Sequence, residues 1–268
     1  MYSGTTFRQK SGHLIGVHQK IDRVARRNIK HLPGAAVGFP VIRDILHFEG
    51  NNGPDGIKRK SPSQDEPWHY VDPSDPNDRV IIDMILDHKH NLTEALKTGN
   101  EHRAAFEAAW LAHAIVDGLT PAHHYPLSDK IEELWGKPKE ERLTLIDKNL
   151  IRGQGSRETI SKNWQYWGAK GVWATHFMFE WGVATTIKPM RFNDTLPSSH
   201  WVESALEHGF EREMNRAIQH IYRLDMYHNF WQNGWTAKLA RQTRTILMPE
   251  IIRMVTLAWY DAYREAGV

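Results

Sequence analysis

The sequence predicts an all-α protein, an irregular bundle of many helices. Apolar residues recur every three or four positions along most of the 268-residue chain, which is the spacing of an amphipathic helix. No segment shows the alternation of a half-buried strand, and no internal repeat is present. Apolar and charged residues make up 40% and 25% of the chain, fractions typical of globular proteins. A chain of this length can bury one large core, so we expect a single domain over residues 1–268.

The first predicted helix covers residues 14–29, where apolar side chains form one face and basic side chains the other. Pro33 and Gly34 end it, and a short amphipathic helix is expected over 41–48. Residues 50–78 are rich in Gly, Pro, Asn, Asp and Ser, and no regular structure is expected there. An irregular stretch of that length inside a compact domain is usually functional or disordered.

Helical periodicity resumes after this stretch and continues almost to the end of the chain. The predicted helical segments are 80–96, 101–116, 131–150 with an interruption near 136–138, 156–186, 200–230, and 236–265 with a kink at Pro249. Three glycines are candidate break points in the aromatic-rich segment 156–186, namely Gly168, Gly171 and Gly182. Loops are expected at 153–155 and 188–199.

The composition excludes several kinds of protein. The formal net charge of +2 does not favour nucleic acid or anionic lipid as a stable partner. There is no cysteine, so disulfides and thiolate metal sites are excluded, whereas 16 histidines are a generous supply of metal ligands. No apolar run reaches the roughly 20 residues of a transmembrane helix. Residues 1–12 are polar and show no signal peptide, from which a cytoplasmic location is expected, and the oligomeric state stays open.

The most informative motif lies at the end of the predicted helix 101–116. His113 and Asp117 are four residues apart, so they lie one above the other on a helix, and His123 follows just past its end. The surrounding Ala, Leu, Ile and Val imply burial. A lone buried carboxylate is very costly, and a metal ion held with the two imidazoles would compensate it. A hydrogen-bonded core pair without a metal would explain the same spacing.

Three further motifs contain candidate ligands. His176 and Glu180 repeat the spacing of four residues, although a hydrogen-bonded or solvent-facing pair would do the same. His13 stands at the start of the first helix, where a lone histidine is more often a surface or capping residue. Asp55 in Gly-Pro-Asp-Gly and His69 in Trp-His-Tyr-Val-Asp-Pro belong to segments that, taken alone, are typical of turns.

Taken together, these motifs resemble the zinc-dependent phospholipase C family. Their order along the chain is His, Gly-Pro-Asp, His-Tyr-x-Asp-Pro, His-x3-Asp-x5-His and His-x3-Glu, and the resemblance covers most of the chain. The closing segment, 247–263, is similar to the last helix of the family. The resemblance implies an all-helical fold, related to single-strand-specific zinc nucleases, that holds three zinc ions in one cleft.

The resemblance also implies which residues hold each ion. Carried over by motif, the ligands are Asp55, His69, His113 and Asp117 for one zinc, His13 and Asp117 for a second, and His123, His176 and Glu180 for a third. Asp117 would then bridge two ions, and Asp55 would orient or deprotonate the attacking water. In members of the family the amine and carbonyl of an N-terminal Trp complete the second site. Here Met1 stands twelve residues before His13, a separation from which its amine can reach.

The implied function is hydrolysis of a phosphodiester, with phospholipase C-like cleavage of phospholipid headgroups by a metal-bound water as the first expectation. The sequence around His69 and the glutamate at position 180 favour lipid over nucleic acid within the resemblance. Two alternatives stay open: a single-strand nuclease or nucleotidase on the same scaffold, and a metal-stabilised helical protein without catalysis. The family is usually secreted, in contrast to the cytoplasmic location expected from residues 1–12.

The chain departs from the family between His123 and His176, which are 53 positions apart, a far longer gap than usual. Residues 127–167 are therefore predicted to be an inserted helical segment over the site. The remaining histidines, His18 among them, are expected mostly at the surface, with His124 as an alternative ligand. A solvated loop is expected for Lys58-Arg59-Lys60, with steering of a phosphate substrate as the alternative. A place in the core is expected for the aromatic group, with a cage for a headgroup as the alternative; its members are Trp164, Tyr166, Trp167, Trp173 and Trp181.

Overall fold

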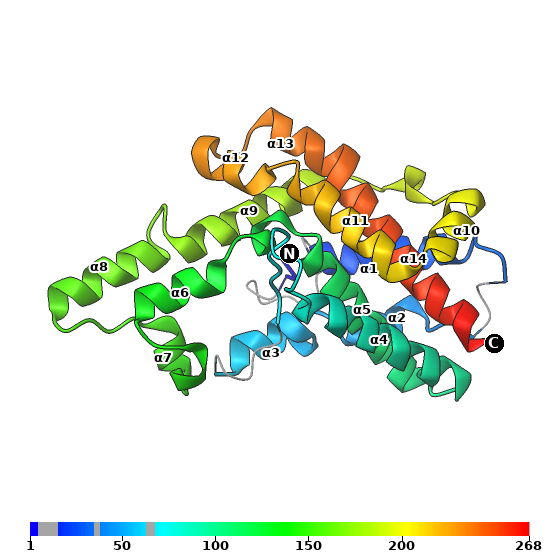
Figure 1. Ribbon diagram of the computed structural model, residues 1–268, viewed down its shortest axis with the longest axis horizontal. Helices are drawn as coiled ribbons and strands as arrows, with labels where there is room; N and C mark the ends of the chain where they lie inside the picture. Colours follow the sequence, from blue (N-terminus) through cyan, green and yellow to red (C-terminus); the bar gives the residue numbers. More distant parts are fainter. Residues whose placement is uncertain (5–15, 35–37, 63–67, 268) are drawn as a thin grey trace.

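The computed structural model describes residues 1–4, 16–34, 38–62 and 68–267, and within these ranges it contains helices and no strand. The predicted all-α fold is confirmed (Figure 1). The helices of the first half are α1 (Val17–Ile29), α2 (Ile42–His47), η2 (Gly50–Asn52), α3 (Pro54–Lys60), α4 (Val80–Lys97), α5 (Glu101–Gly118) and η4 (Pro121–His124). None of the described helices is both long and apolar enough to cross a membrane.

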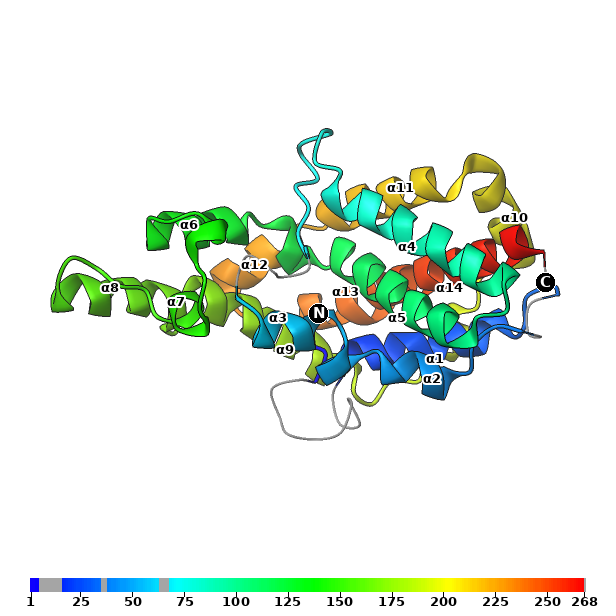
Figure 2. The ribbon, with the colours of Figure 1, turned by 90° about the horizontal axis from the view of Figure 1, so that it is seen from below.

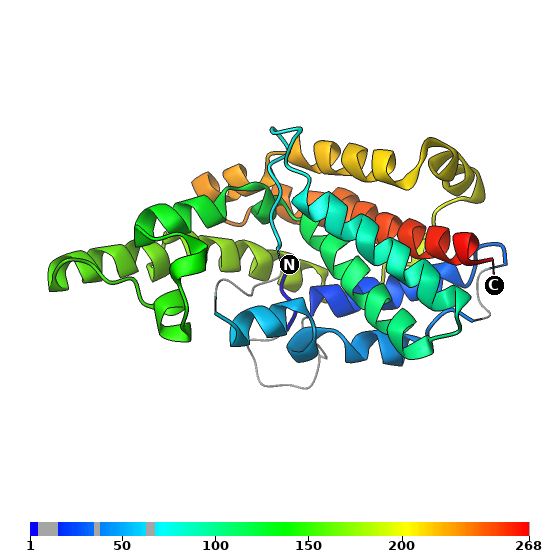
Figure 3. The ribbon, with the colours of Figure 1, turned by 60° about the horizontal axis from the view of Figure 1, so that its bottom comes forward.

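Helix α5 is the centre of the bundle. It packs along α4, while α1 and α14 (Met248–Ala266) lie against the same pair, as the views from below show (Figure 2, Figure 3). Alanines at 104, 105, 108, 109 and 112 are all buried, and small side chains let neighbouring helices approach closely. The indole Nε1 of Trp259, on α14, donates to the Ala108 carbonyl at 2.9 Å inside this contact. These contacts hold α5 in a fixed place for the side chains on its last turns.

The expectation of no regular structure over 50–78 is wrong for its first part. Pro54 occupies the first turn of α3, where its missing N–H costs nothing and its fixed φ suits a helix. A Cβ at Gly56 would collide with the Asn51 carbonyl, so the glycine lets α3 pack directly on η2. Asp55 therefore sits on a short, closely packed helix. From Trp68 to Arg79 the described chain has no helix, as predicted.

A group of short helices projects beyond the bundle, on the left in Figure 1. It consists of α6 (Leu127–Trp135), η5 (Lys139–Glu141), α7 (Leu145–Asn149) and α8 (Ser156–Trp167), and α9 (Val172–Ile187) leads back into the bundle. The interruption near 136–138 is confirmed, because Gly136 ends α6 with φ +66°. Breaks at Gly168 and Gly171 are also confirmed. The break at Gly182 is wrong, since α9 continues through it and the ring of Trp235 packs where a Cβ would be.

The last part of the chain packs mainly against α14 and α9. It comprises η6 (Asn193–Thr195), α10 (Ser199–His208), α11 (Phe210–Tyr222), α12 (Met226–Asn233), α13 (Ala237–Gln242) and the π-helical turn η7 (Thr243–Leu247) before α14. The predicted helical segment 200–230 is divided by positive φ values at Gly209 and Asp225. The π-helical turn stands directly before Pro249, which has no N–H for the helical ladder, so the expected irregularity in the last helix is present.

Candidate metal centre

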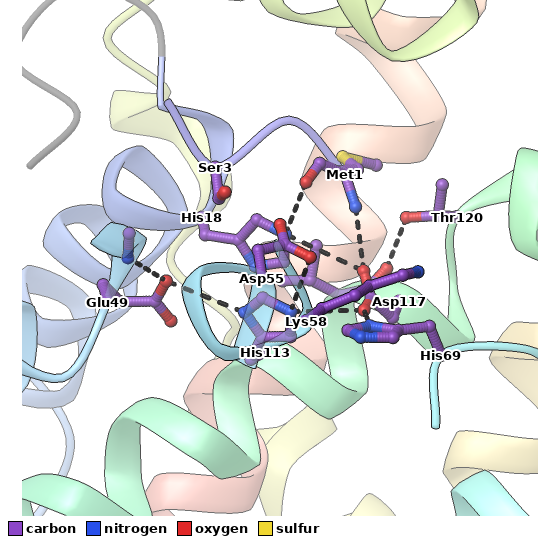
Figure 4. Close-up of polar contacts among 12 residues, drawn as sticks. Met1, Ser3, His18, Glu49, Asp55, Lys58, His69, His113, Asp117 and Thr120 are labelled. Atoms are coloured by element: carbon purple, nitrogen blue, oxygen red, sulfur yellow. Dashed lines mark hydrogen bonds and ion pairs between the residues drawn. The ribbon is translucent and has the colours of Figure 1, made fainter. Parts of the chain in front are cut away.

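His113 and Asp117 lie on the last two turns of α5, and both are buried, with 2% and 1% of their surface exposed. They lie one above the other, as the spacing predicts, with 3.3 Å between His113 Nε2 and Asp117 Oδ2 (Figure 4). The backbone hydrogen bonds of α5 and the packing of its alanines hold both side chains in place. The end of α5 therefore presents an imidazole and a carboxylate in a fixed geometry.

Asp117 lies at the centre of the cluster in Figure 4. Its Oδ1 is 2.8 Å from the Met1 amine, 3.4 Å from His123 Nδ1 and 3.7 Å from His18 Nε2. Its Oδ2 is 2.5 Å from His69 Nδ1 and 3.3 Å from His113 Nε2. One carboxylate thus faces four imidazoles and an amine from five different segments of the chain.

Three groups of side chains have ligand atoms that all lie within 4.8 Å of one another. The first group is Asp55, His69 and His113, the second is His18, His113 and Asp117, and the third is His123, His176 and Glu180. The first two share His113, and Asp117 contacts members of all three. The structure therefore places three candidate metal sites side by side.

The distances between these ligand atoms are those expected for atoms that bind the same metal ion. Two ligands about 2.0–2.2 Å from one tetrahedral ion lie about 3.3 Å apart. In the third group, His123 Nε2 and His176 Nε2 each lie 3.1 Å from Glu180 Oε1. On α5, His113 and Asp117 are 3.3 Å apart. The 2.5 Å contact of His69 with Asp117 is shorter and fits a direct hydrogen bond.

Buried ring nitrogens without a hydrogen-bond partner are a second indication. Among the described residues these atoms include His69 Nε2 and both nitrogens of His113. A buried polar atom without a partner costs free energy, so native structures rarely leave several together. A bound cation would satisfy imidazole nitrogens, and imidazole with carboxylate suits zinc and similar ions. The residues present therefore fit one or more metal ions.

Neighbouring positive groups keep the carboxylates of the cluster ionised, and the ionised form is the one that binds a cation. Burial raises the pKa of Asp55, but His113 and His69 lower it further, to about 2. Burial likewise raises the pKa values of Asp117 and Glu180, while the Met1 amine and neighbouring imidazoles bring both well below their usual range. All three groups are therefore charged at neutral pH.

Most of the clustered imidazoles are neutral at the same pH. Burial lowers the pKa of His123 to about 3, and it also lowers the pKa values of His18 and His69. His113 is the exception, because Asp117 outweighs burial and raises its pKa well above the usual range. Neutral imidazole is the form that binds a metal, so three of these histidines need not lose a proton first.

The structure brings together seven of the eight predicted ligands, and their binding of metal stays a prediction. They are Asp55, His69, His113, Asp117, His123, His176 and Glu180. The eighth, His13, lies outside the described residues. His124 is not in any of the three groups, because its Nε2 lies 2.8 Å from the Gly118 carbonyl, which accepts a hydrogen bond from it.

The expectation that His18 lies at the surface is wrong. It is fully buried and its ring stacks on His113, with 4.0 Å between the ring centres. A signal was available, since His18 follows Val17 and precedes Ile21 by three residues on the apolar face of the first helix. A histidine on that face points inward with its neighbours.

The first residues of the chain enter the cluster beside His18. Val17 N–H donates to the Tyr2 carbonyl at 2.8 Å, and Gln19 Nε2 donates to the Ser3 carbonyl at 2.8 Å, so residues 1–3 lie along the start of α1. The Met1 carbonyl accepts a hydrogen bond from His18 Nε2 at 2.8 Å. The Met1 amine contacts Asp117 and also lies 3.4 Å from Glu180 Oε1. Both backbone groups of Met1 therefore face the candidate ligands.

Two buried carboxyl groups stand behind His113, and the sequence patterns did not indicate either. Glu49 Oε2 lies 3.7 Å from His113 Nδ1, on the far side of the ring from Asp117. Asp22, on α1, is fully buried, and neither of its carboxyl oxygens has a hydrogen-bond partner among the described residues. Burial raises the pKa values of both groups, and the charge of Glu49 adds to the shift at Asp22. Glu49 is placed to orient the His113 ring.

A cavity of about 300 Å³ opens beside the cluster. Five of the candidate ligands line it: Asp55, His69, His123, His176 and Glu180. The segment 127–167, predicted to lie over the site, contributes part of its wall.

Two predictions about this wall hold only in part. The run Lys58-Arg59-Lys60 ends α3 rather than forming a loop; Arg59 and Lys60 are exposed as predicted, while Lys58 and Arg59 also line the cavity. Of the aromatic group assigned to the core, Tyr166 is buried and Trp181 packs against the core as predicted, whereas Trp167 and Trp173 line the cavity and Trp164 is 71% exposed.

Comparison of the chain with models of protein families, with curated proteins and with solved structures finds no match.

In the metal-free protein, the ion pair of the Met1 amine is expected to stabilise the fold at neutral pH. Burial lowers the pKa of the amine, but Asp117 and Glu180 raise it from 8.0 to about 10. Because the folded value is the higher one, the stabilisation is complete below pH 8 and is lost as the pH rises through 10. The difference corresponds to about 3 kcal/mol of unfolding free energy. Urea unfolding with a chelator, at pH 7 and pH 11, measures it. Protein with an acetylated Met1 amine should not lose this stability between pH 7 and pH 11. If the acetylated and unmodified proteins showed the same pH dependence, the ion pair would not be its cause.

The substitution Glu49→Gln is expected to weaken metal binding about 10- to 100-fold, the usual effect of removing a carboxylate that orients a ligating histidine. Glutamine keeps the volume of the side chain, so packing behind His113 should survive. Competition with a chromogenic chelator measures the affinity. Glu207→Gln, at an exposed position on α10, is the matched control. Equal affinities for the two variants would rule out a positioning role for Glu49.

Proposed function

We propose that this protein is a metal-dependent phosphoric ester hydrolase that cleaves phosphodiesters. The observation that supports this most strongly is the sharing of ligands: two of the three candidate groups have His113 in common, Asp117 contacts members of all three, and members of the first and third groups line one cavity. A cluster of two or three ions supplies an activated water and neutralises the charge on phosphoryl oxygens. The chemical nature of the ligands and the resemblance to zinc-dependent phospholipases C both favour zinc.

The proposed ligand sets follow the three groups. Asp55, His69 and His113 hold one ion, and His123, His176 and Glu180 hold another. Asp117 and His18 hold the remaining ion, together with the backbone groups of Met1. In this arrangement Asp117 would bridge two ions, since each of its carboxylate oxygens faces a different set of partners.

Asp55 is the residue proposed to act on the water. Its side chain is 25% exposed and lines the cavity, whereas Asp117 is buried. A carboxylate with a pKa of about 2 is a weak base, so it does not hold a proton at neutral pH. Its proposed role is to accept a hydrogen bond from the attacking water and to orient it toward phosphorus. The proton of this water then passes to Asp55 while the water oxygen attacks phosphorus, and not before.

Phospholipase C-like removal of a phospholipid headgroup is the first candidate reaction, as the resemblance implies. A nuclease or nucleotidase is the second candidate, and one observation favours it. The rings of Trp167 and Trp173 lie 4.7 Å apart and line the cavity that the candidate ligands share. An aromatic platform can stack a nucleobase, with about 1–3 kcal/mol for each base stacked.

The substitution Asp55→Asn is expected to lower turnover by roughly 10²- to 10⁴-fold, the range for loss of an acid–base group. Purified protein is assayed on bis(p-nitrophenyl) phosphate, a short-chain phosphatidylcholine and a dinucleotide, with metal content measured in parallel. Asp87→Asn, at an exposed position on α4, is the matched control. Unchanged turnover in Asp55→Asn would remove its catalytic role. A metal-bound protein without turnover on any of the three substrates would support a purely structural cluster.

The substitution Asp117→Ala is expected to lower the metal content by more than one ion per chain, because its carboxylate serves more than one group. Glu180→Ala should lower it by one ion at most, since Glu180 belongs to a single group. Elemental analysis after dialysis measures both. Asp117→Asn, which keeps the volume, replaces the alanine variant if that variant does not fold. Full metal content in either folded Asp117 variant would disprove the bridging role.

A further inference from the structure

Exposed apolar side chains gather on the group of short helices that projects beyond the bundle (Figure 1). Seven of the thirteen large apolar side chains that are exposed among the described residues lie between positions 143 and 167, in fewer than a tenth of the residues of the chain. They are Leu143, Leu145, Ile146, Leu150, Ile160, Trp164 and Trp167. Single exposed apolar residues are ordinary on a protein surface, whereas a concentration of them marks a surface that binds something.

Helix α8 shows that these side chains are left over from the core of the projecting group. One face of α8 is packed: Asn163 Nδ2 donates to the Ile151 carbonyl at 2.7 Å, and Tyr166 is buried in a cluster with Ile151. Ile160 and Trp164, four residues apart, share another face and are 69% and 71% exposed. The helix is therefore fixed by its inner face, while its outer face presents an isoleucine and a tryptophan to the surroundings.

The apolar side chains extend along the projecting group as far as the cavity of the candidate metal centre. The end of α7 meets the end of α8 where Trp167 Nε1 donates to the Asn149 carbonyl at 3.0 Å, next to the exposed Leu150 in the chain. Trp167 is itself 39% exposed and also lines the cavity. A partner bound to this surface would therefore lie beside the proposed reaction site.

Basic side chains accompany the apolar ones around α8. Residues 150–170 contain four basic residues and one acidic residue, and the acidic one, Glu158, lies 3.0 Å from Lys162. The whole segment 127–170 has nine basic and seven acidic residues, so the excess lies at α8 and its flanks. Three exposed basic side chains have no carboxylate partner among the described residues, namely Arg152, Arg157 and Lys170. The net charge of the whole chain does not reveal this excess, because it is local.

We propose that the projecting group docks on the surface of an anionic lipid bilayer, with Ile160, Trp164 and the exposed side chains of α7 entering the headgroup region. Apolar side chains lower their free energy by leaving water there, and tryptophan is enriched at that depth. Arginine and lysine are attracted to anionic lipids over the same distance. Docking needs no turnover, so the inference goes beyond the proposed hydrolase and does not depend on it.

Charge favours a lipid surface over a second copy of the chain. Two copies that met through this face in a symmetric dimer would bring the same basic residues of both chains together, and like charges repel. An anionic bilayer would instead meet complementary charge around the apolar side chains. A combination of exposed tryptophan and aliphatic residues with lysine and arginine is also typical of helices that lie in a membrane interface.

Co-sedimentation with sucrose-loaded vesicles tests the docking surface. The wild type is expected to bind vesicles of phosphatidylcholine mixed with phosphatidylserine, and to bind phosphatidylcholine alone more weakly. Trp164→Ser should weaken binding to the mixed vesicles about tenfold or more, because a large apolar side chain no longer leaves water. Trp231→Ser, which removes a tryptophan of α12 that is 45% exposed, is the matched control and should bind like the wild type.

Ile160→Ser replaces the Trp164 variant if that variant does not fold. Failure of the wild type to bind the mixed vesicles, or equal binding by the wild type and the folded variant, would overturn the docking surface. Sedimentation velocity without lipid tests the alternative occupant. A dimer of the wild type that Trp164→Ser cannot form would assign this face to a second copy of the chain and would also overturn the proposal.

Turnover of a soluble substrate separates docking from catalysis. Trp164 does not line the cavity, so Trp164→Ser should hydrolyse bis(p-nitrophenyl) phosphate as fast as the wild type does. Vesicle binding without turnover of any substrate would support the docking surface and contradict the hydrolase. Turnover of bis(p-nitrophenyl) phosphate without vesicle binding would contradict the docking surface and support the hydrolase.

Discussion

The structure depends on the burial of one carboxylate, that of Asp117. Moving a charge out of water costs several kcal/mol, and the cost is recovered only when partners surround it. Here the partners come from the first residues of the chain, α1, the segment 68–70, α5 and η4. One charge therefore lies where five segments of the chain meet. A cation bound between them would serve the same purpose more strongly than an amine and a protonated imidazole.

The bundle explains why this cluster can be well ordered. Alanines on α5 allow α4, α1 and α14 to approach it closely, so the helix that carries His113 and Asp117 is fixed by packing on several sides. Helix α9 carries His176 and Glu180 from the projecting group back into the bundle. Glu49 and Asp22 add two buried carboxyl groups on the side of His113 away from Asp117. Candidate ligands supported in this way would already be in position for an ion.

Local patterns in the sequence were enough to predict most helices and the pairs that share one helical face. Periodicity depends on neighbours three and four residues away, so α4, α5 and the pairs His113–Asp117 and His176–Glu180 could be derived from it. The tertiary structure alone decided that His18 meets Asp117, that carboxyl groups lie behind His113, and that basic side chains from α3 and from the projecting segment line one cavity. Each of these depends on contacts between residues far apart in the chain, such as Lys148 with Lys58. Spacing along a helix determines its faces, but only the packing of the whole bundle determines what each face meets.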